Sequence, residues 1–111
     1  MKTVRIFFSP IAESAYKELC ERNDKIAQSL LRAIEQKREF LKLNPHYGET
    51  LGKKLIPKEY KNVDNLYRVE LPDFWRMLYT LSSEESNDET VVLILDILSH
   101  PKYNKKFGYK S

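Results

Sequence analysis

The sequence predicts one α+β domain over residues 1–111, with helices on one face of a mainly antiparallel sheet. Residues 65–81 hold two alternating apolar and polar runs on either side of a Pro-Asp turn, which is the pattern of a β-hairpin. Residues 10–43 hold apolar side chains at helical spacing with one interruption, which is the pattern of two helices. A chain of 111 residues is long enough to bury a single core.

The first predicted element is a strand over residues 2–8, in which alternate side chains are apolar. Ser9 and Pro10 then begin a helix, because serine caps a helix well and proline suits the first helical position. Cys20 extends the apolar stripe of this helix and is predicted to be a small core residue rather than a nucleophile. With one cysteine the chain cannot form an internal disulfide, which favours a reducing compartment, the cytoplasm.

A second helix is predicted over about residues 25–43, with Leu30 and Ile34 among its core positions. Because the link between the two helices is short, they are predicted to form an antiparallel helical hairpin. Residues 51–56 follow as a short extended piece or a loop.

The β-hairpin is predicted to have one core face and one partly open face. Its even positions carry Arg68 and Arg76, on the open face. A three-residue loop over residues 72–74 keeps both strands in phase and sets Glu70 opposite Arg76. Such loops usually have glycine at the last position, where φ is positive. Phe74 at that position is therefore expected to lower the stability of the hairpin. The odd positions carry nearly all of the large apolar side chains and are predicted to face the core: Tyr67, Val69, Leu71, Trp75, Met77, Tyr79 and Leu81.

The last predicted strand covers residues 90–98, which are almost continuously apolar. Such a run suits an interior strand that is covered on both faces, so the hairpin and this strand form a three-stranded antiparallel meander. After His100 the chain is predicted to end in a short basic tail. The basic and aromatic residues of interest in this tail are Lys102, Tyr103, Lys105, Lys106 and Tyr109.

Composition excludes several classes of function. The apolar run near the N-terminus is too short for a signal peptide or a membrane span, so no membrane partner is expected. The sequence has no glycine-rich phosphate loop and no metal-ligand spacing, so neither a cofactor nor a metal is expected. The net charge is +3, and lysines gather in residues 53–61 and 100–111 while acids gather near residue 85. This asymmetry indicates a surface for an anionic partner, although solvated lysines explain it equally well.

The basic and aromatic residues are those that bind RNA. Arginine and lysine neutralise phosphates, and tyrosine and histidine stack on unpaired bases. Histidine also transfers protons near neutral pH. The alternative is purely structural: Arg76 pairs with Glu70 across the hairpin, and the lysines are simply solvated.

Three stretches of the chain resemble the RelE/ParE superfamily of bacterial and archaeal toxins. They are residues 44–55, residues 66–79 with their Leu-Tyr-Arg-Val and Trp-Arg-Met-Leu-Tyr runs, and residues 91–103 with the closing His-Pro-Lys-Tyr. The resemblance covers nearly the whole chain in the same order of elements. It implies a RelE-like fold: an N-terminal strand, an antiparallel helical hairpin, a three-stranded meander and a basic tail.

In RelE-type members the resemblance implies a toxin that enters the ribosomal A site and cuts mRNA without a metal. The partners implied are the ribosome with mRNA and a cognate antitoxin, the latter in a hetero-oligomeric complex. By position in the family pattern, the catalytic residues would be Arg76, His100, Lys53 and Lys54. The RNA-binding residues would be Arg68, Lys102, Tyr103, Lys105, Lys106 and Tyr109. Two alternatives remain open: a ParE-like inhibitor of DNA gyrase, and a non-toxic binding member of the superfamily.

Overall fold

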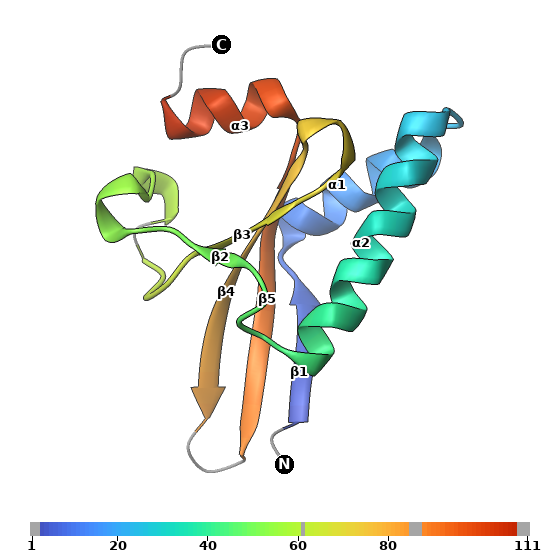
Figure 1. Cartoon of the computed structure of the whole chain (residues 1–111). Coiled ribbons are helices and arrows are strands. Elements are labelled where there is room, and N and C mark those ends of the chain that lie inside the picture. The colour runs from blue at the N-terminus through green and yellow to red at the C-terminus, as the bar shows by residue number, and fades with distance from the viewer. Residues whose placement is uncertain (1–2, 61, 85–87, 109–111) are drawn as a thin grey trace.

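The computed structural model describes residues 3–60, 62–84 and 88–108 as a five-stranded sheet with helices on both faces (Figure 1). The strands are β1 (Thr3–Phe8), β2 (Glu49–Thr50), β3 (Tyr67–Glu70), β4 (Arg76–Glu84) and β5 (Glu89–Leu98). The helices are α1 (Pro10–Glu21), α2 (Lys25–Leu43) and α3 (His100–Phe107). Three short 3-10 turns are η1 (Lys53–Leu55), η2 (Lys58–Tyr60) and η3 (Pro72–Phe74).

The sheet confirms the predicted α+β class. Its strand order is β1-β5-β4-β3-β2. The meander of β3, β4 and β5 is antiparallel, as predicted, while β1 joins the far side of β5 in parallel. The almost continuously apolar β5 is therefore an interior strand, flanked by β1 and β4.

The hairpin of β3 and β4 has the predicted register. Glu70 lies opposite Arg76, and the Leu71 amide donates to the Trp75 carbonyl over 2.9 Å. The loop between the two strands has the expected three residues, 72–74. Asp73 and Phe74 have φ angles of 57° and 62°. This left-handed conformation destabilises a residue with a Cβ by about 1 kcal/mol relative to glycine. Phe74 therefore has the expected unfavourable backbone conformation.

The helical hairpin of α1 and α2 lies on one face of the sheet, as predicted (Figure 1). Ser9 caps α1: its Oγ accepts from the Ala12 amide over 3.1 Å and donates to the Leu95 carbonyl over 2.8 Å. Asp24 caps α2 in the same way through the Ala27 amide, over 3.2 Å. These caps fix both helix starts, and the Ser9 bond ties the first of them directly to β5.

The main core fills the space between the helical hairpin and the sheet. Leu30 and Ile34 are fully buried there, as predicted. Trp75 packs against this core but is only half-buried. The buried residues of the cluster are Ala12, Leu19, Ala27, Leu30, Ile34, Leu41, Tyr67, Val69, Leu71, Met77, Tyr79, Val92, Ile94 and Ile97.

The prediction for Cys20 is wrong, because this side chain is exposed. Helix α1 packs on β5 through Ala12 and Leu19, which are buried, and Ala15, which is half-buried. Cys20 comes one residue after this stripe and therefore falls outside the contact.

Residues 100–107 of the predicted basic tail form helix α3, which the sequence analysis did not predict. Ser99 is the N-cap residue, Pro101 lies in the first turn, and Gly108 ends the helix at a φ of 75°. These are ordinary helix start and stop residues. Helix α3 lies on the opposite side of the sheet from α1 and α2 (Figure 1). The predicted residue Tyr109 lies outside the described part of the chain.

Helix α3 forms a second, smaller core on that face. Leu78 of β4 and Leu98 of β5 are buried beneath it, together with Tyr103 of the helix. Leu51, Ile56 and Val63, from the segment between β2 and β3, pack against the same cluster. The face that carries Arg68 and Arg76, predicted to be partly open, is therefore partly covered.

Candidate functional site

Two arginines lie side by side on the sheet face that α3 covers. Arg68 is in β3 and Arg76 in β4, both at even positions that point away from the main core. Their side chains are 19% and 14% exposed. Charged groups are rarely this buried without partners, so their neighbours decide what they can do.

Tyr103 of α3 holds the two arginines together. Arg68 Nη1 donates to Tyr103 Oη over 2.8 Å. The Cζ atoms of Arg68 and Arg76 lie 5.8 Å and 5.0 Å from the centroid of the Tyr103 ring, which are cation–π contacts. The ring itself stacks on Phe107 at 4.4 Å. We call Arg68, Arg76 and Tyr103 the arginine–tyrosine cluster.

Two carboxylates neutralise this cluster from its solvent side. Glu49 Oε2 lies 2.6 Å from Arg68 Nη2. Glu70 bridges both arginines, with Oε2 at 3.1 Å from Arg76 Nε and Oε1 at 3.6 Å from Arg68 Nε. Both carboxylates are more than 60% exposed. Both carboxylates therefore reach the half-buried guanidiniums from solvent, where an anionic ligand could compete with them.

Arg68 is charged at every pH of interest. Burial lowers the pKa of its guanidinium, but hydrogen bonds to Tyr103 and Glu49 outweigh burial and raise the pKa above its usual value. The cluster therefore presents a permanent positive charge, of the kind that binds phosphate or carboxylate.

His100 lies beside the cluster, at the first residue of α3, and is exposed. Its ring packs against Phe74 with 5.6 Å between the centroids. Arg76 donates through Nη1 to the Phe74 carbonyl, so Phe74 contacts both residues. His100 Nε2 also lies 3.2 Å from Asn104 Nδ2, one helical turn away. The fold thus brings the predicted residues Arg76 and His100 to the same hairpin loop.

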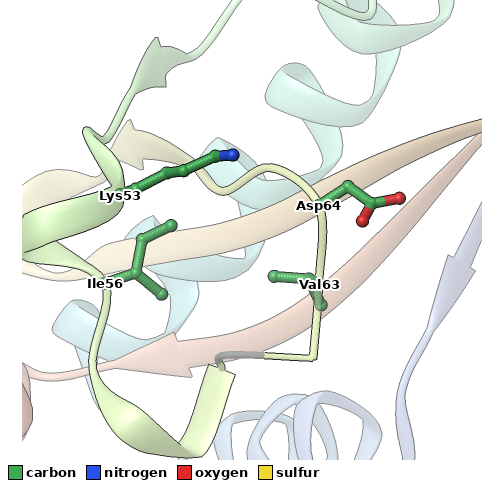
Figure 2. A pocket seen from close by; sticks show the side chains of 4 residues that line it. All are labelled: Lys53, Ile56, Val63 and Asp64. Atoms are coloured by element: carbon green, nitrogen blue, oxygen red, sulfur yellow. The ribbon is translucent and has the colours of Figure 1, made fainter.

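Lys53 and Lys54 are exposed on η1, outside this grouping. Lys53 instead lines a cavity of about 420 Å³ with Ile56, Val63 and Asp64 (Figure 2). The segment that carries this cavity packs on the second core, so it lies on the α3 side of the sheet.

The α3 lysines divide into two kinds. Lys102 and Lys105 are exposed, as an RNA-binding or partner-binding role requires. Lys106 Nζ instead lies 2.8 Å from Glu59 Oε2 and 3.4 Å from the buried Asp96 Oδ2. Burial lowers the pKa of Lys106, but its bond to Glu59 and its neighbours Tyr60 and Asp96 raise it above its usual value.

Lys106 thus anchors α3 to the sheet through a buried polar network. Tyr60 Oη donates to Asp96 Oδ2 over 3.1 Å, and Asp96 Oδ1 accepts from the Ile97 amide over 2.9 Å. Burial, with the neighbouring Asp96 charge, raises the pKa of Tyr60 to about 12. The network fixes the position of α3, and with it Tyr103 over the arginines.

Four residues that shape the site were not predicted from the sequence: Glu49, Tyr60, Asp96 and Asn104. Asp96 had a visible signal, since it is the one charge inside an apolar strand. Asn104 comes four residues after His100. Residues at this spacing are neighbours only in a helix, and no helix was predicted there. Glu49 contacts Arg68 through the register of β2, which is two residues long and has no sequence signature.

Two features are absent from residues 3–60, 62–84 and 88–108. No three His, Cys, Asp or Glu side chains gather there in a way that could hold a metal ion. No helix in these ranges is long and apolar enough to cross a membrane.

Comparison with known proteins gives a likeness of fold. No protein-family model and no curated protein sequence matches the chain. Among solved structures, it is similar to a chain of the intact E. coli RelBE toxin–antitoxin complex, with a TM-score of 0.50 and 14% sequence identity. The match covers 86% of this chain and 94% of that chain. The chain therefore has a RelE-like fold, as the sequence resemblance implied.

Proposed function

We propose that this chain, with its RelE-like fold, is the toxin of a toxin–antitoxin system and cuts mRNA on the ribosome. The observation that carries the proposal is that Arg76 and His100 both contact Phe74 in the hairpin loop, while Tyr103 links Arg76 to Arg68. Two half-buried guanidiniums and one exposed imidazole on a single face suit a phosphodiester and a proton transfer. Inhibition of translation in the cytoplasm would follow from the cleavage.

In this reaction the RNA 2′-oxygen attacks the adjacent phosphorus, and the bond to the 5′-oxygen breaks. Arg76 stabilises the negative charge that develops on the phosphate oxygens. His100 carries a proton, taken from the 2′-hydroxyl or given to the leaving 5′-oxygen. Lys53 and Lys54 orient the RNA backbone and share the acid–base work. Arg68, Lys102, Lys105 and Tyr109 bind the RNA, while Tyr103 and Lys106, which pack against the sheet, hold the site in place.

The carboxylates on the cluster are compatible with this role. Glu49 and Glu70 contact the guanidiniums that the phosphate would contact, and both are largely exposed. A phosphodiester can compete with them because both carboxylates lie on the solvent side and a phosphate offers the guanidiniums similar charge-assisted hydrogen bonds. Ribosomal RNA and mRNA supply the alignment, so few catalytic groups are needed on the protein.

The proposed inhibitory partner is an antitoxin protein in a hetero-oligomeric complex. The similar fold comes from a chain of a toxin–antitoxin complex. Lys102 and Lys105 on the exposed side of α3 offer a contact for an acidic antitoxin segment.

Primer extension on mRNA translated in a purified system tests the proposal. We expect new 5′ ends that require both the protein and ribosomes, and their loss with Arg76→Ala. If the protein cuts nothing but stalls gyrase on DNA, the ParE-like alternative replaces this proposal. If it does neither and still binds an antitoxin, it is a non-toxic binding member.

A further inference from the structure

Phe74 has an unusual backbone conformation for its residue type. It follows Asp73 in the hairpin loop, and the two residues have positive φ angles of 62° and 57° respectively. Aspartate tolerates this left-handed region, whereas the last position of such a loop favours glycine. A bulky side chain there is unfavourable unless other interactions compensate for it. The backbone alone therefore gives no reason for a phenylalanine at this position.

Packing does not explain Phe74 either. The residue is 68% exposed, and neither of the two cores in the described part of the chain includes it. Its ring lies beside the ring of His100, at 5.6 Å between the centroids and an interplanar angle of 49°. An aromatic side chain stabilises a fold through the apolar surface that it buries, and Phe74 buries little. A strained residue whose ring faces water indicates a binding role.

The groups next to Phe74 suit a nucleotide. Arg76 donates through Nη1 to the Phe74 carbonyl, so a guanidinium lies against the backbone of the loop. The exposed His100 ring flanks the side chain where the loop comes close to the start of α3 (Figure 1). A guanidinium binds a phosphate, and unpaired bases stack on exposed phenylalanine and histidine rings. A nucleotide carries both a phosphate and a flat ring, so it matches this pair of features.

We propose that Phe74 stacks on an unpaired base of the RNA, next to the phosphate that Arg76 binds. Every base has a π face, so the contact positions the RNA without reading its sequence. Phe74 is then a binding residue that holds the RNA backbone against Arg76 and His100. This inference rests on the proposed function, because it takes RNA as the ligand.

Binding of short RNA to the full chain tests the stack without ribosomes. One probe is the trinucleotide A-A-A with 2′-O-methyl groups, which block cleavage, and the other has the same backbone without bases. Because both probes carry the same phosphates, the ratio of their affinities isolates the contribution of the bases. We expect A-A-A to bind about tenfold more tightly and to shift the aromatic NMR signals of Phe74. Equal affinities, or unshifted Phe74 signals at saturating A-A-A, would overturn the proposal.

Phe74→Ala removes the ring and keeps the Cβ, so it should reduce this affinity ratio by about tenfold, whereas Phe74→Trp should preserve the ratio. Phe7→Ala is the matched control. Phe7 is also exposed and also lies beside an arginine, with Arg5 Cζ 5.2 Å from its ring centroid. It belongs to β1, which β5 separates from the β4 strand of Arg76. An unchanged ratio in Phe74→Ala, or an equal fall in Phe7→Ala, would exclude Phe74 as the stacking residue.

Phe74→Gly separates binding from folding. Glycine adopts the left-handed conformation readily, so the unfolding temperature should stay the same or rise while the affinity ratio falls. A purely structural role for the ring predicts the opposite pair of results. A lower unfolding temperature with an unchanged affinity ratio would therefore overturn the proposal.

The ribosome assay separates failure of this inference from failure of the proposed function. If Phe74→Ala loses the affinity ratio but the unchanged protein does not cut mRNA on ribosomes, the stack stands and the nuclease proposal fails. If the protein cuts mRNA and Phe74→Ala cuts it with the same kcat and KM, the nuclease stands and the stack fails. If Phe74→Ala keeps its RNA binding but loses affinity for an antitoxin, the ring anchors a protein partner and the stack fails.

Discussion

Arg76 lies directly opposite Glu70 in the β3–β4 hairpin, and its Nε is 3.1 Å from Glu70 Oε2. This pair is what a purely structural role for Arg76 requires. The same guanidinium, however, also lies over Tyr103 and bonds to the Phe74 carbonyl beside His100. A structural role and a role in RNA cleavage predict different effects when Arg76 or Glu70 is substituted.

Arg76→Ala is expected to lower mRNA cleavage on ribosomes by about 10²–10³, because one charge contact to the transition state is lost. The variant also loses the contact over Tyr103 and the bond to the Phe74 carbonyl, so we expect stability to fall by about 1–3 kcal/mol without loss of the fold. Single-turnover cleavage and thermal unfolding of the same preparation measure the two effects.

Glu70→Gln removes the same ion pair but keeps the arginine, so it is the control. It should leave cleavage intact and strengthen RNA binding, because a competing anion is gone. Equal, small losses of stability in both variants, with cleavage unchanged in both, would make Arg76 a structural residue only.

His100→Ala should lower the cleavage rate by less than Arg76→Ala, because a neighbouring lysine can replace a proton carrier. Its side chain is exposed at the start of α3, so the unfolding midpoint should hardly change. Cleavage time courses of the two variants give the ratio. A His100→Ala rate equal to that of the unchanged protein would remove this residue from the mechanism.

Lys106→Met should destabilise the protein by about 1–3 kcal/mol, because it leaves the buried Asp96 without its cationic partner. Lys105→Met, one residue earlier and exposed, should change stability by less than about 0.5 kcal/mol. Urea unfolding of both variants provides the comparison. Similar midpoints would mean that the network does not anchor α3.

Alkaline pH should weaken the fold through Tyr60 and Tyr79. Burial raises the pKa of both phenols from 10.0 to about 12. Between these values the unfolded chain has already lost protons that the folded protein keeps, so stability is full below about pH 10 and falls as pH rises. Unfolding followed at a series of pH values should show this fall, and Tyr60→Phe and Tyr79→Phe should each flatten it.

Antitoxin binding should depend on the exposed α3 lysines. Lys102→Glu with Lys105→Glu reverses two exposed charges without touching the second core. A cognate antitoxin with an acidic segment should then bind at least tenfold more weakly, and the loss should shrink at high salt. Unchanged affinity in a calorimetric titration would place the contact elsewhere.

The hairpin was predictable because its information is local. The period-2 pattern assigns each side chain to a face, and the three-residue loop fixes Glu70 opposite Arg76. The helix at the C-terminus was not predicted although Ser99, Pro101 and Gly108 mark its ends. Only eight residues lie between Ser99 and Gly108, and five of them are lysine, histidine or asparagine, so the apolar pattern is short and sparse. Its covering of the arginines depends on tertiary packing of Tyr103, which no local pattern encodes.

Lys53 shows a different limit of the sequence. A pair of lysines before the hairpin indicates an anionic ligand but not its geometry. The cavity beside Lys53 exists because Val63 and Asp64, ten and eleven residues later, return to the same place. That return is set by packing on the second core, so it became visible only with the structure.

The parallel pairing of β1 with β5 brings together two strands that lie far apart in the sequence. Bonds such as that from Ser9 to Leu95 span 86 residues, whereas β3, β4 and β5 pair with near neighbours. Closing so long a loop costs entropy before any contact offsets it, so the meander should form first and β1 should dock late. Loosening β1, for example by Ile6→Ala, should therefore speed unfolding far more than it slows refolding. The lifetime of the native state then depends on how firmly its first strand stays attached.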